Sequence, residues 1–131
     1  MTHDPVNPPH YDGRECADIG ERLTANGYQV LKYVWRLGRK DAAIVELGKA
    51  AWYADSECKL FANLAAAGIP MRTAPLVFDL ADPAAFFHDR ISKQPEFTQT
   101  IARMLWHGYN LDGIQIIFDL ITVERTCYER T

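Results

Sequence analysis

Five basic side chains gather in one short stretch of the sequence: Lys32, Arg36, Arg39, Lys40 and Lys49. On a helix, offsets of four, seven and eight residues place the first four on one face or on its continuation past the helix end. Like charges held this close repel one another unless an anion compensates them. The stretch therefore predicts a binding site for phosphate or another anion.

Acidic side chains are scarce around these cations. Between residues 29 and 49 the acids are Asp41 and Glu46, although the whole chain has a net charge of −3. A positive island in an acidic protein indicates a local anion site and argues against a coat that binds nucleic acid, which requires a broadly basic face. Two alternatives stay open: a run of Lys and Arg is often a solvated helix face, and Arg36 can be a structural partner of Asp41 or Glu46.

The loops that commonly bind phosphate are missing from the sequence. A Walker A loop needs Ser or Thr after its Gly-Lys pair, whereas Gly48-Lys49 is followed by Ala50. The sequence also lacks the glycine-rich dinucleotide turn, the Gly-x-Ser-x-Gly elbow and the His-Glu-x-x-His metal motif. Its histidines and cysteines have no zinc-ligand spacing, so no metal site is predicted.

The composition is that of one globular domain spanning residues 1 to 131, with 48% hydrophobic and 24% charged residues. Its longest uncharged apolar run, Leu60 to Met71, is too short to cross a membrane, and the N-terminus lacks the features of a signal peptide. We expect a cytoplasmic protein with no membrane partner. Cys16, Cys58 and Cys127 are widely spaced, which favours buried free thiols.

Helix signals divide most of the chain and predict an all-α fold, a compact bundle of five to six helices. An extended arm is expected first, because residues 4 to 13 hold three prolines and a closing glycine. The predicted helices cover about 15–25, 28–38, 42–66, 82–91, 95–108 and 112–128. The pair Asn26-Gly27 predicts the stop between the first two. A short extended piece at 76–78 and a strand in place of helix at 114–121 remain alternatives.

The clearest periodicity runs through the third predicted helix. Its apolar positions step by three and four residues: Ile44, Leu47, Ala51, Ala54, Cys58, Phe61 and Ala65. This heptad-like seam predicts a long helix and a homo-oligomer. Trp52 and Tyr53 lie off the seam, where they face the preceding helix, a subunit partner or a ligand.

Several ordered blocks of the N-terminal half resemble one known family. They are Asp4-Pro-Val-Asn7, Pro9-His10-Tyr11, Glu15-Cys16-x-Asp18, Lys32-Tyr33-x-Trp35-Arg36-x-Gly38-x-Lys40-Asp41 and Leu47-x-Lys49-Ala50-x-Trp52-Tyr53. The sequence thereby resembles a family of small phage proteins, known mostly as a domain of unknown function, that includes a podophage nucleotide kinase without a P-loop. The resemblance covers about residues 4–56 and leaves 57–131 as an unmatched helical extension.

The resemblance implies a nucleotide kinase that transfers a phosphoryl group to a (deoxy)nucleoside monophosphate, with Mg²⁺ and a nucleoside triphosphate as possible co-reactants. The candidate catalytic residues are Lys32, Arg36 and Asp18. The candidate ligand contacts are His10, Tyr11, Lys32, Arg36, Arg39, Lys40, Lys49 and Tyr53. Phosphoryl transfer relies on positioning and on charge neutralisation, and arginine and lysine side chains supply both.

Individual roles follow as hypotheses. Arg36 and Lys40 hold phosphates, Lys32 and Lys49 bridge the transferring group, and His10 with Tyr11 closes over the base or sugar. Asp18, Asp41 or Glu46 orients the acceptor or holds Mg²⁺.

Two further functions fit the same residues. A non-catalytic protein that sequesters a nucleotide or cyclic nucleotide, and so counters a host defence, needs the same positive site. A helical protein–protein interaction module instead needs only the apolar seam, with the cations solvated.

Overall fold

The structure is a computed structural model that describes residues 13–130. Its six helices are α1 (Gly13–Gly20), α2 (Ala25–Trp35), α3 (Ala43–Ala66), α4 (Pro83–Ile91), α5 (Glu96–His107) and α6 (Leu111–Glu129). No strand occurs in this part of the chain, so the predicted all-α fold is confirmed and residues 114–121 are helical. Residues 76–78 belong to a loop and a turn. Apart from Gly13, the predicted arm lies outside the described residues.

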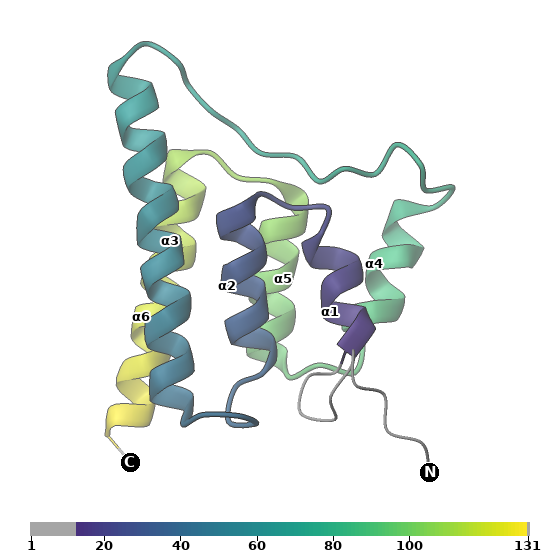
Figure 1. The fold of residues 1–131 in the computed structure, drawn as a ribbon, viewed down its shortest axis with the longest axis vertical. Coiled ribbons are helices and arrows are strands. Elements are labelled where there is room, and N and C mark those ends of the chain that lie inside the picture. The colour runs from purple at the N-terminus through teal and green to yellow at the C-terminus, as the bar shows by residue number, and fades with distance from the viewer. Residues whose placement is uncertain (1–12, 131) are drawn as a thin grey trace.

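The helices pack as a bundle (Figure 1). The long helices α3 and α6 form an antiparallel pair at one edge, α2 and α5 lie in the middle, and α1 and α4 lie at the other edge. Within residues 13–130, no helix is both long and apolar enough to cross a membrane.

The core confirms much of the predicted seam. From α3, Leu47, Ala54, Cys58 and Phe61 are buried, and α6 contributes isoleucines at 114, 117 and 121. Ala65 is exposed, so the buried seam ends before the helix does. The face that α3 buries also includes Ala50 and two carboxylates, Glu46 and Glu57. These two acids matter for the site, because buried charge must be compensated by nearby partners.

The start of α2 corrects one prediction. Asn26-Gly27 does not end a helix: α2 already begins at Ala25, and Gly27 lies within its first turn. The reason is the Thr24 N-cap, whose hydroxyl accepts a hydrogen bond from the Gly27 amide at 2.9 Å. The preceding helix ends earlier than predicted, at Gly20.

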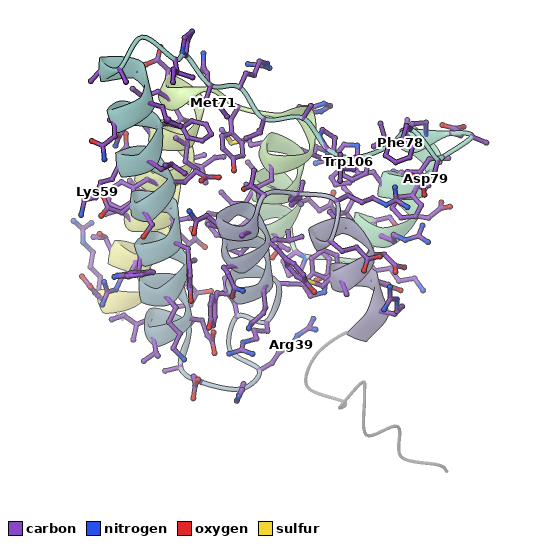
Figure 2. All side chains as sticks on the ribbon, turned by 45° about the horizontal axis from the view of Figure 1, so that its top comes forward. Arg39, Lys59, Met71, Phe78, Asp79 and Trp106 are labelled. Carbon is purple, nitrogen blue, oxygen red and sulfur yellow. The ribbon has the colours of Figure 1, made fainter. Side chains whose placement is uncertain are left out.

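A long connection, residues 67–82, runs across one end of the bundle (Figure 1). The guanidinium of Arg22 fastens it by donating to the Leu76 carbonyl and to an Asp79 carboxylate oxygen, both at 2.7 Å. The Leu76 amide in turn donates to the Arg22 carbonyl at 2.9 Å. Phe78 and Asp79 lie on this connection at the edge of the molecule (Figure 2), and the Phe78 side chain is largely exposed.

The three cysteines differ in burial. Cys16 and Cys58 are buried free thiols, as predicted. Cys127 is exposed, so the prediction is wrong for this residue. It lies near the end of α6, beyond Ile121, the last buried residue of that helix.

Candidate anion-binding site

Three of the predicted cations surround one aromatic ring. Lys32 of α2 and Arg36, the C-cap residue that follows this helix, place Nζ and Cζ at 5.0 and 4.9 Å from the centroid of the Tyr33 ring. Lys49 from α3 places its Nζ at 5.5 Å from the same centroid. Cations at this distance are attracted to the negative face of a tyrosine ring. The antiparallel packing of α2 on α3 therefore gathers positive charge from two helices at Tyr33.

An aromatic row continues from this ring along α3. The rings of Tyr33 and Tyr53 are stacked, with centroids 5.9 Å apart and planes at 13°. Trp52 meets Tyr53 edge-on at 5.0 Å, and 65% of Trp52 is exposed. We call these three rings with Lys32, Arg36 and Lys49 the Tyr33 cluster.

Arg36 is the buried member of the cluster. Its Nε donates to Glu46 Oε2 at 3.2 Å, and the exposed fractions of the two side chains are 5% and 0%. This pairing is the structural role that the sequence left open for Arg36. The second carboxylate oxygen, Glu46 Oε1, is also buried and meets no hydrogen-bond donor among residues 13–130. A buried pair of this kind holds α2 against α3, and it limits how far Arg36 reaches toward a ligand.

The two lysines of the cluster are more accessible. Lys49 pairs with Asp41 at 3.3 Å, and both side chains are about two-fifths exposed. The hydrogen bond from Lys49 is the main cause that holds the pKa of Asp41 below its usual value. Lys32 forms no ion pair with any carboxylate in the described part of the chain. Among the described residues, Lys32 is therefore the cation of the cluster that lacks a carboxylate partner.

Arg39 and Lys40 do not share the helical face of Lys32 and Arg36. The predicted helix 28–38 lies three residues too far along the chain, because α2 begins at Ala25 and ends at Trp35. Gly38 adopts φ +72°, a left-handed conformation that glycine tolerates and that interrupts helical geometry. Both side chains are exposed on the connection to α3, from which Arg39 projects in Figure 2.

Asp18, on α1, is paired with two arginines outside the Tyr33 cluster. Its two carboxylate oxygens accept from Arg14 at 2.8 Å and from Arg90 of α4 at 3.0 Å. These contacts direct the carboxylate toward α4, whereas the Tyr33 cluster belongs to α2 and α3. The structure therefore does not bring Asp18 together with the predicted cations. His10 and Tyr11 lie outside the described residues.

A buried polar network was not predicted. Glu57, 2% exposed, accepts hydrogen bonds from the Tyr109 hydroxyl at 2.6 Å, from the Thr24 hydroxyl at 2.7 Å and from the Asn26 amide at 3.1 Å. Burial and the Glu57 hydrogen bond raise the pKa of Tyr109. The network joins α2, α3 and the turn before α6.

The sequence carried a partial signal for this network in the spacing of Glu57 from the seam residues of α3. Glu57 is three residues after Ala54 and four before Phe61, both seam positions, so it lies beside the seam; Asp55 also lies beside the seam and its side chain is 41% exposed, so this spacing alone does not decide burial. Glu46 lies eleven residues, or about three helical turns, before Glu57 and therefore shares its face of α3.

The Tyr33 cluster combines two elements that suit nucleotide recognition: accessible cations for phosphate and an exposed aromatic surface for a base.

Among residues 13–130, no three His, Cys, Asp or Glu side chains group in a way that holds a metal ion. In comparisons with known proteins, no family model, curated protein or solved structure matched the chain.

Proposed function

We propose that this protein binds a nucleotide at the Tyr33 cluster. Lys32 and Lys49 contact the phosphates, and the base stacks on Trp52. The observation that carries the proposal is the convergence of three cationic side chains on one tyrosine ring, within 5.5 Å of its centroid. Among the described residues, Glu46 pairs with Arg36 and Asp41 pairs with Lys49, whereas Lys32 has no carboxylate partner, so a phosphate bound at Lys32 lowers the electrostatic free energy of the site.

The aromatic row argues for a nucleotide in preference to a bare inorganic anion. Trp52 is 65% exposed and is braced edge-on by Tyr53. A large exposed indole contributes little to folding, whereas stacking of a base on an aromatic side chain contributes about 1–3 kcal/mol to binding. The indole and the lysines are connected through Tyr33 and Tyr53, so one ligand can contact both.

We further propose phosphoryl transfer to a (deoxy)nucleoside monophosphate, as the family resemblance implies. The acids next to the cluster are Asp41 and Glu46, which makes Asp41 the better candidate to orient an acceptor, since Asp18 is held toward α4. A Mg²⁺ ion that accompanies a triphosphate takes most of its ligands from phosphate and water and needs only one or two carboxylates.

The binding test compares Lys32→Ala with Lys59→Ala by calorimetric titration with deoxynucleoside mono-, di- and triphosphates and cyclic nucleotides. Lys59 lies on α3, pairs with Asp55 and is outside the cluster, so it matches the charge change. Removing one charge-assisted phosphate contact costs about 1.5–3 kcal/mol, or roughly 10- to 100-fold in Kd. We expect this loss for Lys32→Ala and an unchanged Kd for Lys59→Ala; equal Kd values for the two variants would refute the site.

The proposed stacking of the nucleotide base on Trp52 is tested with the variant Trp52→Ala, and Leu60→Ala is the control. Both side chains are exposed apolar residues of α3, but only Trp52 belongs to the cluster. Nucleotide affinity falls for Trp52→Ala alone if the base stacks there, while affinity for inorganic phosphate stays the same in both variants.

Turnover separates a kinase from a sequestering protein. Wild type and Asp41→Asn are incubated with the nucleotide that binds, Mg²⁺ and ATP, and the products are separated by chromatography. A kinase transfers the γ-phosphoryl group of ATP to the nucleoside monophosphate and forms its diphosphate together with ADP, and Asp41→Asn forms this diphosphate more slowly with affinity retained. A protein that binds tightly but forms no product sequesters its ligand.

A second candidate function is self-association or docking of a partner helix. It is favoured by an exposed apolar stripe on α6, in which Ile116, Leu120 and Val123 are 51%, 36% and 62% exposed. Their spacing of four and three residues is that of a helix-pairing seam. Sedimentation velocity of wild type and Val123→Asp tests it: an oligomer that becomes a monomer in the variant supports pairing, and a monomeric wild type contradicts self-association.

A further inference from the structure

A cavity of about 500 Å³ opens between α4 and α5, two helices that carry none of the Tyr33 cluster. From α4 its lining includes Phe87, His88 and Ile91, and from α5 it includes Arg103, Trp106 and His107. A volume of this size falls in the range of sites for small organic molecules.

The floor of the cavity is apolar and rigid. Ile91 is 1% exposed, and Phe87 and Trp106 are each 7% exposed. The Trp106 ring stacks on Phe87, with centroids 5.0 Å apart and planes at 15°, and also on Phe86 at 6.2 Å. Two parallel aromatic neighbours fix the orientation of the indole, so the floor offers a preformed surface for a flat apolar group.

The polar side chains that line the cavity are two histidines and an arginine, and none of them is an acid. His88, Arg103 and His107 are exposed, and no Asp or Glu lines the cavity, although the chain as a whole is acidic. The acids nearest in sequence on the two helices, Asp89 and Glu96, are not among the lining residues.

Arg103 is oriented but not neutralised. Its Nη2 donates to Gln99 Oε1 at 2.9 Å, and it forms no ion pair with a carboxylate in residues 13–130. A guanidinium has five N–H donors in a planar fork that matches a carboxylate. The bond to Gln99 therefore leaves donors for a ligand carboxylate at the edge of the apolar floor.

We propose that this cavity binds a small aromatic carboxylate, with its ring against Trp106 and Phe87 and its carboxylate paired with Arg103. The site is separate from the Tyr33 cluster and does not depend on the function proposed above.

The test is a titration of the full chain with phenylacetate, followed by ¹H–¹⁵N spectra that report the Trp106 indole N–H. The neutral analogue 2-phenylethanol is titrated in parallel. We expect saturable shifts of Trp106 with phenylacetate and at least fivefold weaker binding of 2-phenylethanol. Phenylacetate should bind about tenfold more weakly to Arg103→Gln, in line with loss of a charge-assisted pair.

Three variants keep the outcome unambiguous. Ala84→Trp fills the cavity from an exposed lining position and should abolish the shifts. Lys93→Gln, a loss of the same charge outside the lining, and Lys32→Ala, in the Tyr33 cluster, should bind phenylacetate as wild type does. The proposal is overturned if phenylacetate gives no saturable shift of Trp106 at millimolar concentration, if 2-phenylethanol binds equally well, or if Arg103→Gln has the affinity of Lys93→Gln.

Discussion

Replacement of Arg36 by Met tests how much the buried side chain that pairs with Glu46 contributes to stability. The substitution keeps an unbranched apolar side chain against Tyr33 but removes the guanidinium that compensates a carboxylate with 0% exposure. Glu46 Oε1 already meets no donor in the described residues, so Arg36→Met leaves the whole Glu46 carboxylate poorly solvated. Breaking one partner of a buried pair typically costs about 3–5 kcal/mol.

That cost is a large part of the roughly 5–15 kcal/mol by which a domain of this size is stable. The matched control is Lys59→Met, which breaks the 2.8 Å pair with Asp55 on the exposed face of α3. Exposed pairs contribute about 0–1 kcal/mol, so this variant should unfold nearly as wild type does. The double variant Arg36→Met with Glu46→Met should regain most of the lost stability, because it removes the uncompensated charge.

Urea denaturation followed by circular dichroism measures all four proteins. The reasoning is refuted if Arg36→Met costs no more than Lys59→Met, or if the double variant is no more stable than Arg36→Met alone. A confirmed cost also affects the functional tests, because unfolding of an Arg36 variant would abolish nucleotide binding by itself. Lys32→Ala removes a cluster cation without breaking a buried pair.

Three further predictions concern stability. Burial and the Glu57 hydrogen bond raise the pKa of Tyr109, so the contribution of this hydroxyl to folding stability is present below about pH 10 and is lost as the pH rises. Tyr109→Phe should lower the free energy of unfolding by about 1–2 kcal/mol at pH 7. Above pH 10 the melting temperature of this variant should fall less steeply than that of wild type. Lys49 lowers the pKa of Asp41, so the contribution of this carboxylate to folding stability is present above the pKa that Asp41 has in the unfolded chain and is lost as the pH falls. Below pH 4 the melting temperature of Asp41→Asn should therefore decline less than that of wild type. Gly108 has φ +87°, and a Cβ there meets a backbone carbonyl of the 67–82 connection; Gly108→Ala should unfold at lower urea concentration, and a midpoint equal to that of wild type contradicts this explanation.

The helical architecture was predictable because its signals are local. Apolar steps of three and four residues, caps such as Asp82 with Pro83 at the start of α4, and the glycines that end helices act over one or two turns, so the sequence alone specified α3 and an all-α fold. The boundary before α2 was misread because Thr24 competed with Asn26-Gly27 as a local signal. Only the hydrogen bond from the Gly27 amide to the Thr24 hydroxyl identifies the cap.

The sequence by itself determined which side chains carry charge and much of the face that α3 turns inward, but not the burial of Glu46 and Glu57. Tertiary structure decided which of these charges meet. Glu46 and Arg36 are ten residues apart and Glu57 and Tyr109 are 52 apart, and their pairing depends on how α2, α3 and the turn before α6 pack. Packing likewise placed Lys49 beside Tyr33 and Asp18 beside Arg90. Attraction between exposed charges in water is weak and is screened beyond about 10 Å, so only a fixed backbone holds such groups within reach of each other.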